Sequence, residues 1–125
     1  MDQTLAIDKA FTYSRFAQGV TRRDPELVAR VRAPPDARFD LKHWRAVLSA
    51  CSVDTIDVEL RSARRELMLR TVVRDLGLNA PFEEIVSDLS SFADIALEAA
   101  TAAHSKKLFA SAEPPFGFST VAMGK

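Results

Sequence analysis

Residues 58–78 carry two apolar sectors with charged positions between them. Apolar residues recur at helical spacing on two sides of this stretch, at Leu60, Ala63 and Leu67 and again at Met68, Val72 and Leu76. A helix with two apolar sectors is buried on more than one side. Five arginines interrupt these sectors, namely Arg61, Arg64, Arg65, Arg70 and Arg74. Since a buried arginine needs a carboxylate or backbone partner, or a path to water for its charged end, the pattern predicts a helix held by ion pairs.

The arginines of this central helix fit an ion network better than a binding surface. Arg61 and Arg65 share one side of the predicted helix, whereas the last two arginines share another. A nucleic-acid site needs basic residues on one face with aromatic residues between them, and here none lie between. Glu66 precedes Arg70 by four positions, the favourable order for a helical ion pair. We predict a structural network of Glu66, Arg70, Arg74 and Asp75, with contact to a phosphate or a partner as the alternative.

Four further helices are predicted from apolar periodicity, at residues 4–20, 25–32, 41–51 and from 81 to about 108. Asp24 and Asp40 are typical N-cap residues, and Pro25 suits the first position of a helix. Trp44 lies on the apolar face of its helix and is expected to anchor the core. The chain is therefore predicted to be all-α, with about five helices in an antiparallel, bundle-like array.

The ends of the central helix are less sharply marked. Either Asp54 or Asp57 is expected to cap its start. Either Gly77 or Asn79 is expected to end it in a left-handed conformation, because Pro81 cannot simply continue the helix. In the last helix, alanines fill much of the second half, which allows a neighbouring segment to approach closely.

The last ten residues change character. Phe118, Thr120 and Val121 suit a strand better than a helix, and a single strand after five helices has nothing to pair with. We therefore expect residues 1–112 to form a helical domain, and residues 113–125 to be a linker and the first strand of a truncated α+β domain. Gly124 and Lys125 follow that strand, where backbone N–H groups and a lysine can hold a phosphate, so they form an incomplete nucleotide-binding candidate.

Composition excludes several kinds of site and partner. Seventeen basic and 17 acidic residues leave no net charge to attract nucleic acid or acidic lipid. Cys51 is the only cysteine, which rules out an internal disulfide or a cysteine-based metal site, and His43 and His104 have no ligand-spaced partners. The first ten residues do not read as a signal peptide, and no apolar run approaches the roughly 20 residues that span a membrane. A cytoplasmic protein without a nucleic-acid or membrane partner is expected.

Three segments resemble one enzyme family. Residues 65–70 read R-E-L-M-L-R and residues 74–76 read R-D-L, similar to the R-E-M-L-R-I-x-W-R-D-L segment of glutamine synthetase adenylyltransferases. Residues 88–94, D-L-S-S-F-A-D, resemble the E-L-S-x-L-A-D that follows one helix later in that family. Residues 121–125, V-A-M-G-K, resemble the strand that opens its nucleotidyltransferase domain. Val73 stands where the family often has tryptophan, a difference that concerns packing.

The resemblance implies an enzyme that transfers AMP from ATP to a tyrosine of glutamine synthetase and removes it by phosphorolysis. It implies Mg²⁺ and ATP as cofactors, and glutamine synthetase and the signal protein PII as partners. In the family, the strand continues to L-G-G and then to paired aspartates that hold magnesium, and carboxylates of this kind are required for metal-assisted phosphoryl transfer. These would lie beyond Lys125, so we expect this segment to be an inactive helical scaffold. Its position favours the N-terminal, adenylyl-removing half, although both halves carry similar helix motifs.

Two other readings of the sequence stay open. The chain could be a free-standing helical interaction module whose arginine-bearing helix docks an acidic partner, without catalysis. Nucleic-acid binding is a third reading, and it requires affinity that falls steeply with added salt.

Overall fold

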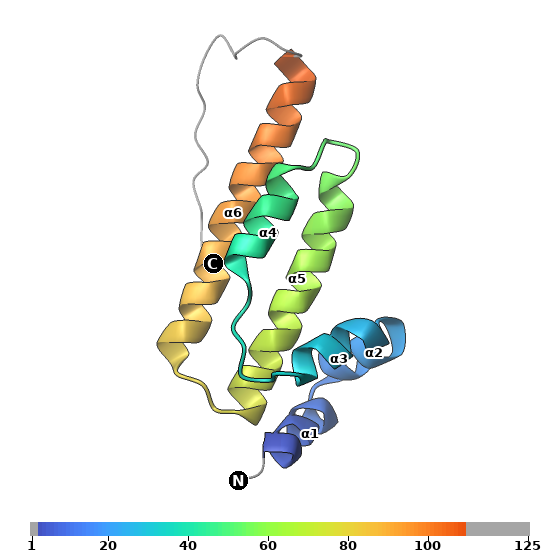
Figure 1. Cartoon of the computed structure of the whole chain (residues 1–125), viewed down its shortest axis with the longest axis vertical. Helices are drawn as coiled ribbons and strands as arrows, with labels where there is room; N and C mark the ends of the chain where they lie inside the picture. Colours follow the sequence, from blue (N-terminus) through green and yellow to red (C-terminus); the bar gives the residue numbers. More distant parts are fainter. Residues whose placement is uncertain (1–2, 110–125) are drawn as a thin grey trace.

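A computed structural model describes residues 3–109, in which two long antiparallel helices carry four shorter ones (Figure 1). The long pair consists of α5 (Ile56–Val72), continued by a π-helical turn η1 (Val73–Gly77), and of α6 (Phe82–Phe109). The shorter helices are α1 (Gln3–Tyr13), α2 (Arg15–Arg23), α3 (Pro25–Arg32) and α4 (Leu41–Ser49). Since every regular element between residues 3 and 109 is helical, the all-α class is confirmed there. The predicted strand near the C-terminus lies outside the described residues.

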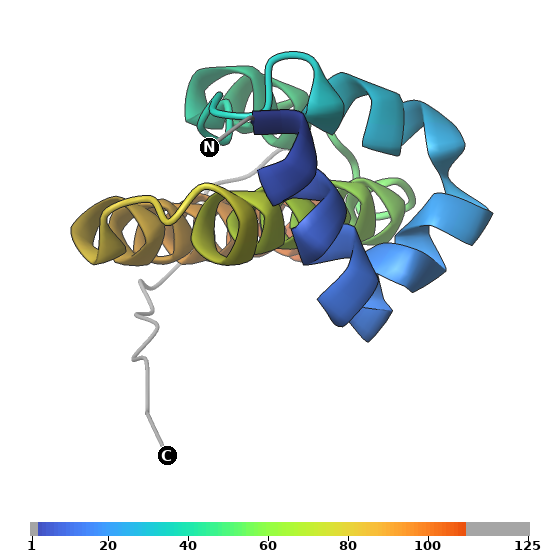
Figure 2. The ribbon, with the colours of Figure 1, turned by 90° about the horizontal axis from the view of Figure 1, so that it is seen from below.

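The short helices pack on different parts of the long pair. Helix α4 lies against both α5 and α6, whereas α2 and α3 pack against α5. Helix α1 packs mainly against η1, and Figure 2 shows it running across that end of the long pair. The turn η1 is therefore enclosed by α1 on one side and by the start of α6 on another.

Helix α5 separates two hydrophobic clusters. Leu69 and Val73 belong to a cluster with α1, α2 and α3, and Ala63 and Leu67 to one with α4 and α6. The prediction of a helix buried on two sides is thus confirmed. The second apolar sector is centred on the fully buried Leu69 and Val73, whereas the predicted Leu76 is 49% exposed.

The predicted single helix at residues 4–20 is wrong, because the chain breaks at Ser14. This residue is extended, with φ −103° and ψ 112°, and its hydroxyl accepts a hydrogen bond from the N–H of Ala17 as the N-cap of α2. The side chain of Gln18 donates to the carbonyls of Phe11 and Thr12 at 3.2 and 2.8 Å, which satisfies the open end of α1. A serine in mid-pattern can supply such a cap, so helical periodicity alone did not show the break.

The caps of the next helices match the prediction, but the start of α5 does not. Asp24 and Asp40 each accept a backbone N–H three residues later, at 3.2 and 3.0 Å. Helix α5 begins after Thr55, whose side chain makes no cap, so the expected caps Asp54 and Asp57 are wrong. The hydroxyl of Thr55 instead accepts a hydrogen bond from the N–H of Ser52 at 3.0 Å, in the turn that precedes the helix. The helix thus grows out of a turn that is already hydrogen-bonded.

The end of the central helix is set by Asn79 rather than Gly77. Asn79 has φ 52°, the left-handed conformation predicted for one of these two residues, and Gly77 has no positive φ. The N–H of Ala80 reaches back to the carbonyl of Arg74 at 2.8 Å, which closes the end of η1.

Gly77 is needed because α1 approaches it closely. A Cβ added there would lie 2.9 Å from the carbonyl oxygen of Ala6 and 3.5 Å from the Cβ of Ala10. Because the first of these atoms belongs to the backbone, Gly77→Ala is expected to push α1 away from η1 and to cost about 1–3 kcal/mol in urea unfolding. Hydrogen exchange should accelerate within α1.

Gly19→Ala is the matched control for this substitution. A Cβ at Gly19 would meet only the flexible end of Arg23, at 3.1 Å. This control should be neutral or stabilising by up to about 1 kcal/mol, because alanine favours the helix. Equal losses for the two variants would contradict the close packing of α1 on η1.

Candidate functional site

The first centre of the candidate site is the carboxylate of Glu66, in the middle of α5. Its side chain is 9% exposed and accepts the indole N–H of Trp44 at 2.8 Å. Its Oε1 accepts a hydrogen bond from Nη2 of Arg30 at 3.3 Å. Nε of Arg70 lies 3.9 Å from Oε2, the oxygen that accepts the indole N–H. One buried carboxylate therefore connects α3, α4 and α5.

The second centre lies where η1 meets α6. The guanidinium of Arg74, 9% exposed, donates to the carboxylate of Glu84 and lies 3.7 Å from that of Asp88. Asp88 is 6% exposed and accepts two hydrogen bonds from Arg38, at 2.6 Å from Nη2 and 3.3 Å from Nε. A bidentate pair of this kind fixes direction as well as distance. The segment between α3 and α4 is thereby attached to α6.

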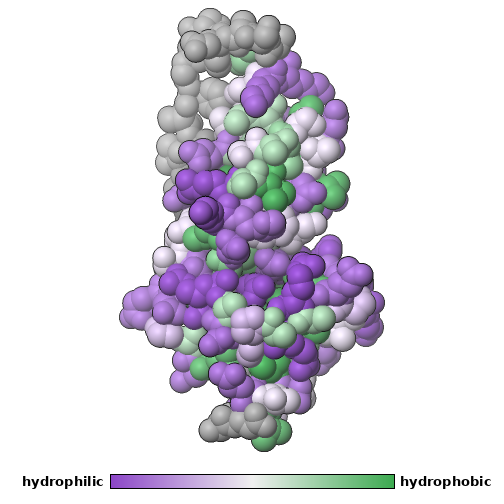
Figure 3. Space-filling model, in the orientation of Figure 1, coloured by the Kyte–Doolittle hydropathy of each residue, from purple (hydrophilic) through white to green (hydrophobic). Residues whose placement is uncertain are grey.

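Arg70 lies between these two centres. Its Nη1 donates to the carbonyl of Ala37 at 3.4 Å, so α5 also holds the segment that carries Arg38. The Nε atoms of Arg70 and Arg74 are buried and lack a hydrogen-bond partner among residues 3–109. Each unmade bond subtracts from the stability that the network supplies, so the network fixes positions more than it adds free energy. Figure 3 shows a band of hydrophilic residues across the middle of this face.

The four residues predicted as a network are placed differently from one another. Glu66 and Arg70 come within 3.9 Å, and Arg74 faces α6 rather than its own helix. Asp75 is exposed, and the structure gives it no ion pair with any residue from 3 to 109. Neighbouring residues of a helical turn point in different directions, so Asp75 faces water while Arg74 faces α6. Gly124 and Lys125 lie outside the described residues.

Several partners were not predicted from the sequence, namely Arg30, Arg38, Trp44, Glu84 and Asp88. Asp88 left a readable signal, since it lies three residues after the buried Ile85 and seven before the buried Ile95, a carboxylate in an apolar register. Trp44 left another, because a buried indole N–H usually has an acceptor. Arg38 left none: it belongs to a non-helical segment whose path depends on the helices around it.

The ion pairs shift two pKa values. The hydrogen bond to Asp88 raises the pKa of Arg38 against desolvation, which lowers it, and the charges of Asp88 and Glu84 add to the rise. The hydrogen bond from Arg74 lowers the pKa of Glu84 below its ordinary 4.5, and the charges of Arg74 and Arg38 act in the same direction.

Glu84 should therefore contribute to stability only in its ionised form. A carboxyl whose pKa is lower in the folded state adds stability above its unfolded pKa and loses it as the pH falls through the folded pKa. The stability difference between the natural chain and Glu84→Gln should be constant from pH 7 to about 5 and shrink below 4.5. Urea unfolding at a series of pH values measures it. A difference that stays constant down to pH 3 would contradict the Arg74 pairing.

The described residues do not assemble a metal site. No three histidine, cysteine, aspartate or glutamate side chains come together between residues 3 and 109. His43 and His104 are exposed, and the thiol of Cys51 is half-buried beside the carbonyl of Val47 at 3.3 Å. Within the same range, no helix has both the length and the apolar character needed to cross a membrane.

Comparison with known proteins identifies the family. The sequence profile of glutamate-ammonia ligase adenylyltransferase matches residues 5–125, nearly the whole chain, and glutamate-ammonia ligase is another name for glutamine synthetase. No curated protein and no solved structure matches the chain. The resemblance of residues 65–76 and 88–94 to this nucleotidyltransferase family is thereby confirmed. The chain belongs to the glutamate-ammonia ligase adenylyltransferase family.

Proposed function

We propose that this chain is the helical scaffold of an enzyme that moves AMP between ATP and a tyrosine of glutamine synthetase. In the complete reaction cycle, AMP is added from ATP with Mg²⁺ and removed by phosphorolysis, under the control of the signal protein PII. Residues 113–125 would begin the nucleotidyltransferase domain, with Gly124 and Lys125 near its nucleotide. The segment would belong to the N-terminal, adenylyl-removing half.

One observation supports the scaffold role above others: the charged residues at the centre are paired with one another. Each of the buried carboxylates Glu66 and Asp88 faces arginines from two separate elements. Together these pairs connect α3, the segment before α4, α5, η1 and α6. Buried ionic groups are weak contributors to stability but can fix the relative positions of elements, which is what a scaffold requires.

A chimera tests this proposal. Residues 5–125 would replace the matching segment of a full-length enzyme of the family, and phosphorolytic release of labelled AMP from adenylylated glutamine synthetase would be measured with Mg²⁺. The chimera is expected to release AMP, and the 125-residue chain by itself is expected not to. Release by the chain alone, or a folded but inactive chimera, would overturn the scaffold role.

Two substitutions in the chimera separate scaffolding from contact. Arg61 is exposed and pairs with nothing in the part of the chain that the structure describes, so Arg61→Ala should leave the rate of AMP release unchanged. Glu66→Ala should lower the temperature at which activity is lost. If Arg61→Ala instead weakens capture of glutamine synthetase, the arginine-bearing helix is an interaction surface, as the free-standing-module reading requires.

A further inference from the structure

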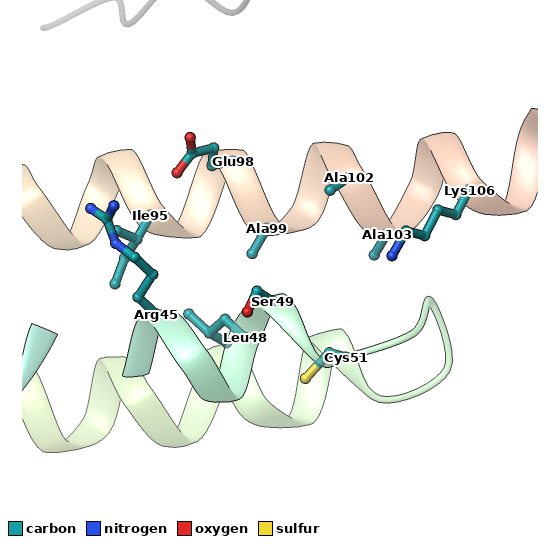
Figure 4. Close-up of a pocket in the computed structure, with 10 residues that line it drawn as sticks. All are labelled: Arg45, Leu48, Ser49, Cys51, Ile95, Glu98, Ala99, Ala102, Ala103 and Lys106. Carbon is teal, nitrogen blue, oxygen red and sulfur yellow. The ribbon is translucent and has the colours of Figure 1, made fainter. Parts of the chain in front are cut away.

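A groove of about 220 Å³ runs between α4 and the second half of α6 (Figure 4). It exists because α4 ends at Ser49, whereas α6 continues to Phe109. The alanines on this side of α6 are too small to fill the space between the two helices. The walls of the groove are mainly apolar, formed by Leu48, Ile95, Ala99, Ala102 and Ala103.

Two cations mark the ends of this groove. Arg45 reaches across one end, and the ammonium of Lys106 points into the other (Figure 4). Neither side chain forms an ion pair with a carboxylate among residues 3–109. Glu98 also lines the groove, but in Figure 4 its carboxylate points away from α4. The described part of the chain thus encloses an apolar space with a positive charge at each end.

The surroundings of the two cations differ. Arg45 also borders a hollow on the surface of α6 that is lined by two acids, Asp94 and Glu98. Their charges offset the charge of Arg45. Lys106 borders a second hollow, lined by Lys107 and by one acid, Asp54. The positive potential is therefore stronger at the Lys106 end, and an anionic group is better placed there.

We propose that this groove binds a medium-chain carboxylate, with its hydrocarbon chain along α6 and its carboxylate at Lys106. An apolar hollow between helices with a few placed polar groups is the usual form of a small-molecule site in a helical bundle. A space of about 220 Å³ holds about seven groups of the size of a water molecule, so a chain of seven or eight carbons fills it. A helix of a partner protein is too large to enter. The site is separate from the arginine–carboxylate network, so its outcome is independent of the enzymatic role proposed above.

An NMR titration of the full 125-residue chain with carboxylates from butanoate to dodecanoate tests this proposal. The dissociation constant of octanoate should be on the order of 0.1–1 mM. Each added methylene should lower it about threefold to fourfold until the groove is full, at about eight carbons, and change it little beyond. Octan-1-ol should bind about threefold more weakly than octanoate, and octylamine more weakly still, because they lack the negative charge. Dissociation constants that do not depend on chain length would overturn the proposal.

Two substitutions test the placement of the ligand. Ala99→Leu fills the groove and should weaken octanoate binding at least tenfold, with an unchanged urea midpoint because the added atoms enter open space. Lys106→Gln should weaken octanoate binding about threefold and leave that of octan-1-ol unchanged. Lys42→Gln is the matched control, an exposed lysine of α4 outside the groove, and should alter neither. Equal effects of the two lysine substitutions would contradict a carboxylate at Lys106.

Cys51 reports on the occupied groove in the natural chain. Its half-buried thiol lines the groove at the Lys106 end (Figure 4). Saturating octanoate should slow the alkylation of this thiol by iodoacetamide at least threefold, whereas the same concentration of octylamine should not. An alkylation rate that octanoate leaves unchanged would overturn the proposal. So would protection without any carboxylate that increases with protein concentration, because a second copy of the chain would then occupy the groove.

Discussion

Replacing Glu66 with alanine is expected to lower the free energy of unfolding by about 3–5 kcal/mol, the usual cost of leaving a buried charge without its partner. The loss has two sources. The indole N–H of Trp44 loses its acceptor at 2.8 Å, and the guanidinium of Arg70, 14% exposed, loses its nearest carboxylate. Arg30 adds little, since its side chain is 59% exposed and water can replace the carboxylate.

Urea unfolding followed by circular dichroism measures this loss, with the fluorescence of Trp44, the only tryptophan, as a second probe. Glu66→Gln keeps an oxygen for the indole N–H but removes the charge, so its cost should be smaller, about 1–2 kcal/mol. Glu98→Ala is the control, an exposed glutamate inside α6 that should change stability by less than about 0.5 kcal/mol. If Glu66→Ala lowered the free energy of unfolding by less than about 0.5 kcal/mol, water would be screening the Glu66 carboxylate and its partners.

Much of the fold could be predicted from residues that act locally. The apolar periodicity of α5 predicted burial on two sides. Asp24 and Asp40 marked helix starts, because each side chain accepts the backbone N–H three residues later. The resemblance to the family was likewise recognised from a continuous stretch, residues 65–76, by the order of its residues. Each of these features depends on neighbours in the sequence.

The features that were missed depend on contacts made by the folded chain. The break at Ser14 is favoured by a hydroxyl that finds a backbone N–H and by the reach of Gln18, neither of which alters the apolar pattern. The partner of Arg74 lies on α6, ten residues onward, because η1 and a short loop turn the chain back on itself. Asp75 was expected to join the network, but a π-helical turn and the packing of α6 decide which side of η1 is buried.

Asp88 is the second position where a large effect is expected. Its carboxylate is 6% exposed, accepts both hydrogen bonds from Arg38 and lies 3.7 Å from Arg74. Asp88→Ala should cost about 3 kcal/mol, because Arg74 stays buried with only the half-exposed Glu84 beside it. Arg38→Ala should cost less, about 1 kcal/mol, since Arg38 is 44% exposed and its removal lets water reach Asp88. Urea unfolding at pH 7 compares the two.

The effect of a second substitution tests the reason for that loss. If the cost of Asp88→Ala comes from a stranded positive charge, then adding Arg74→Met should recover part of it, because the apolar side chain fills a similar space without a charge. The double variant should be more stable than the sum of the single losses predicts, by about 0.5–3 kcal/mol. Strict additivity would mean that Arg74 and Asp88 act independently. In that case apolar packing would hold α6 against η1, and the ion pair between Arg74 and Asp88 would fix the position of α6 without stabilising it.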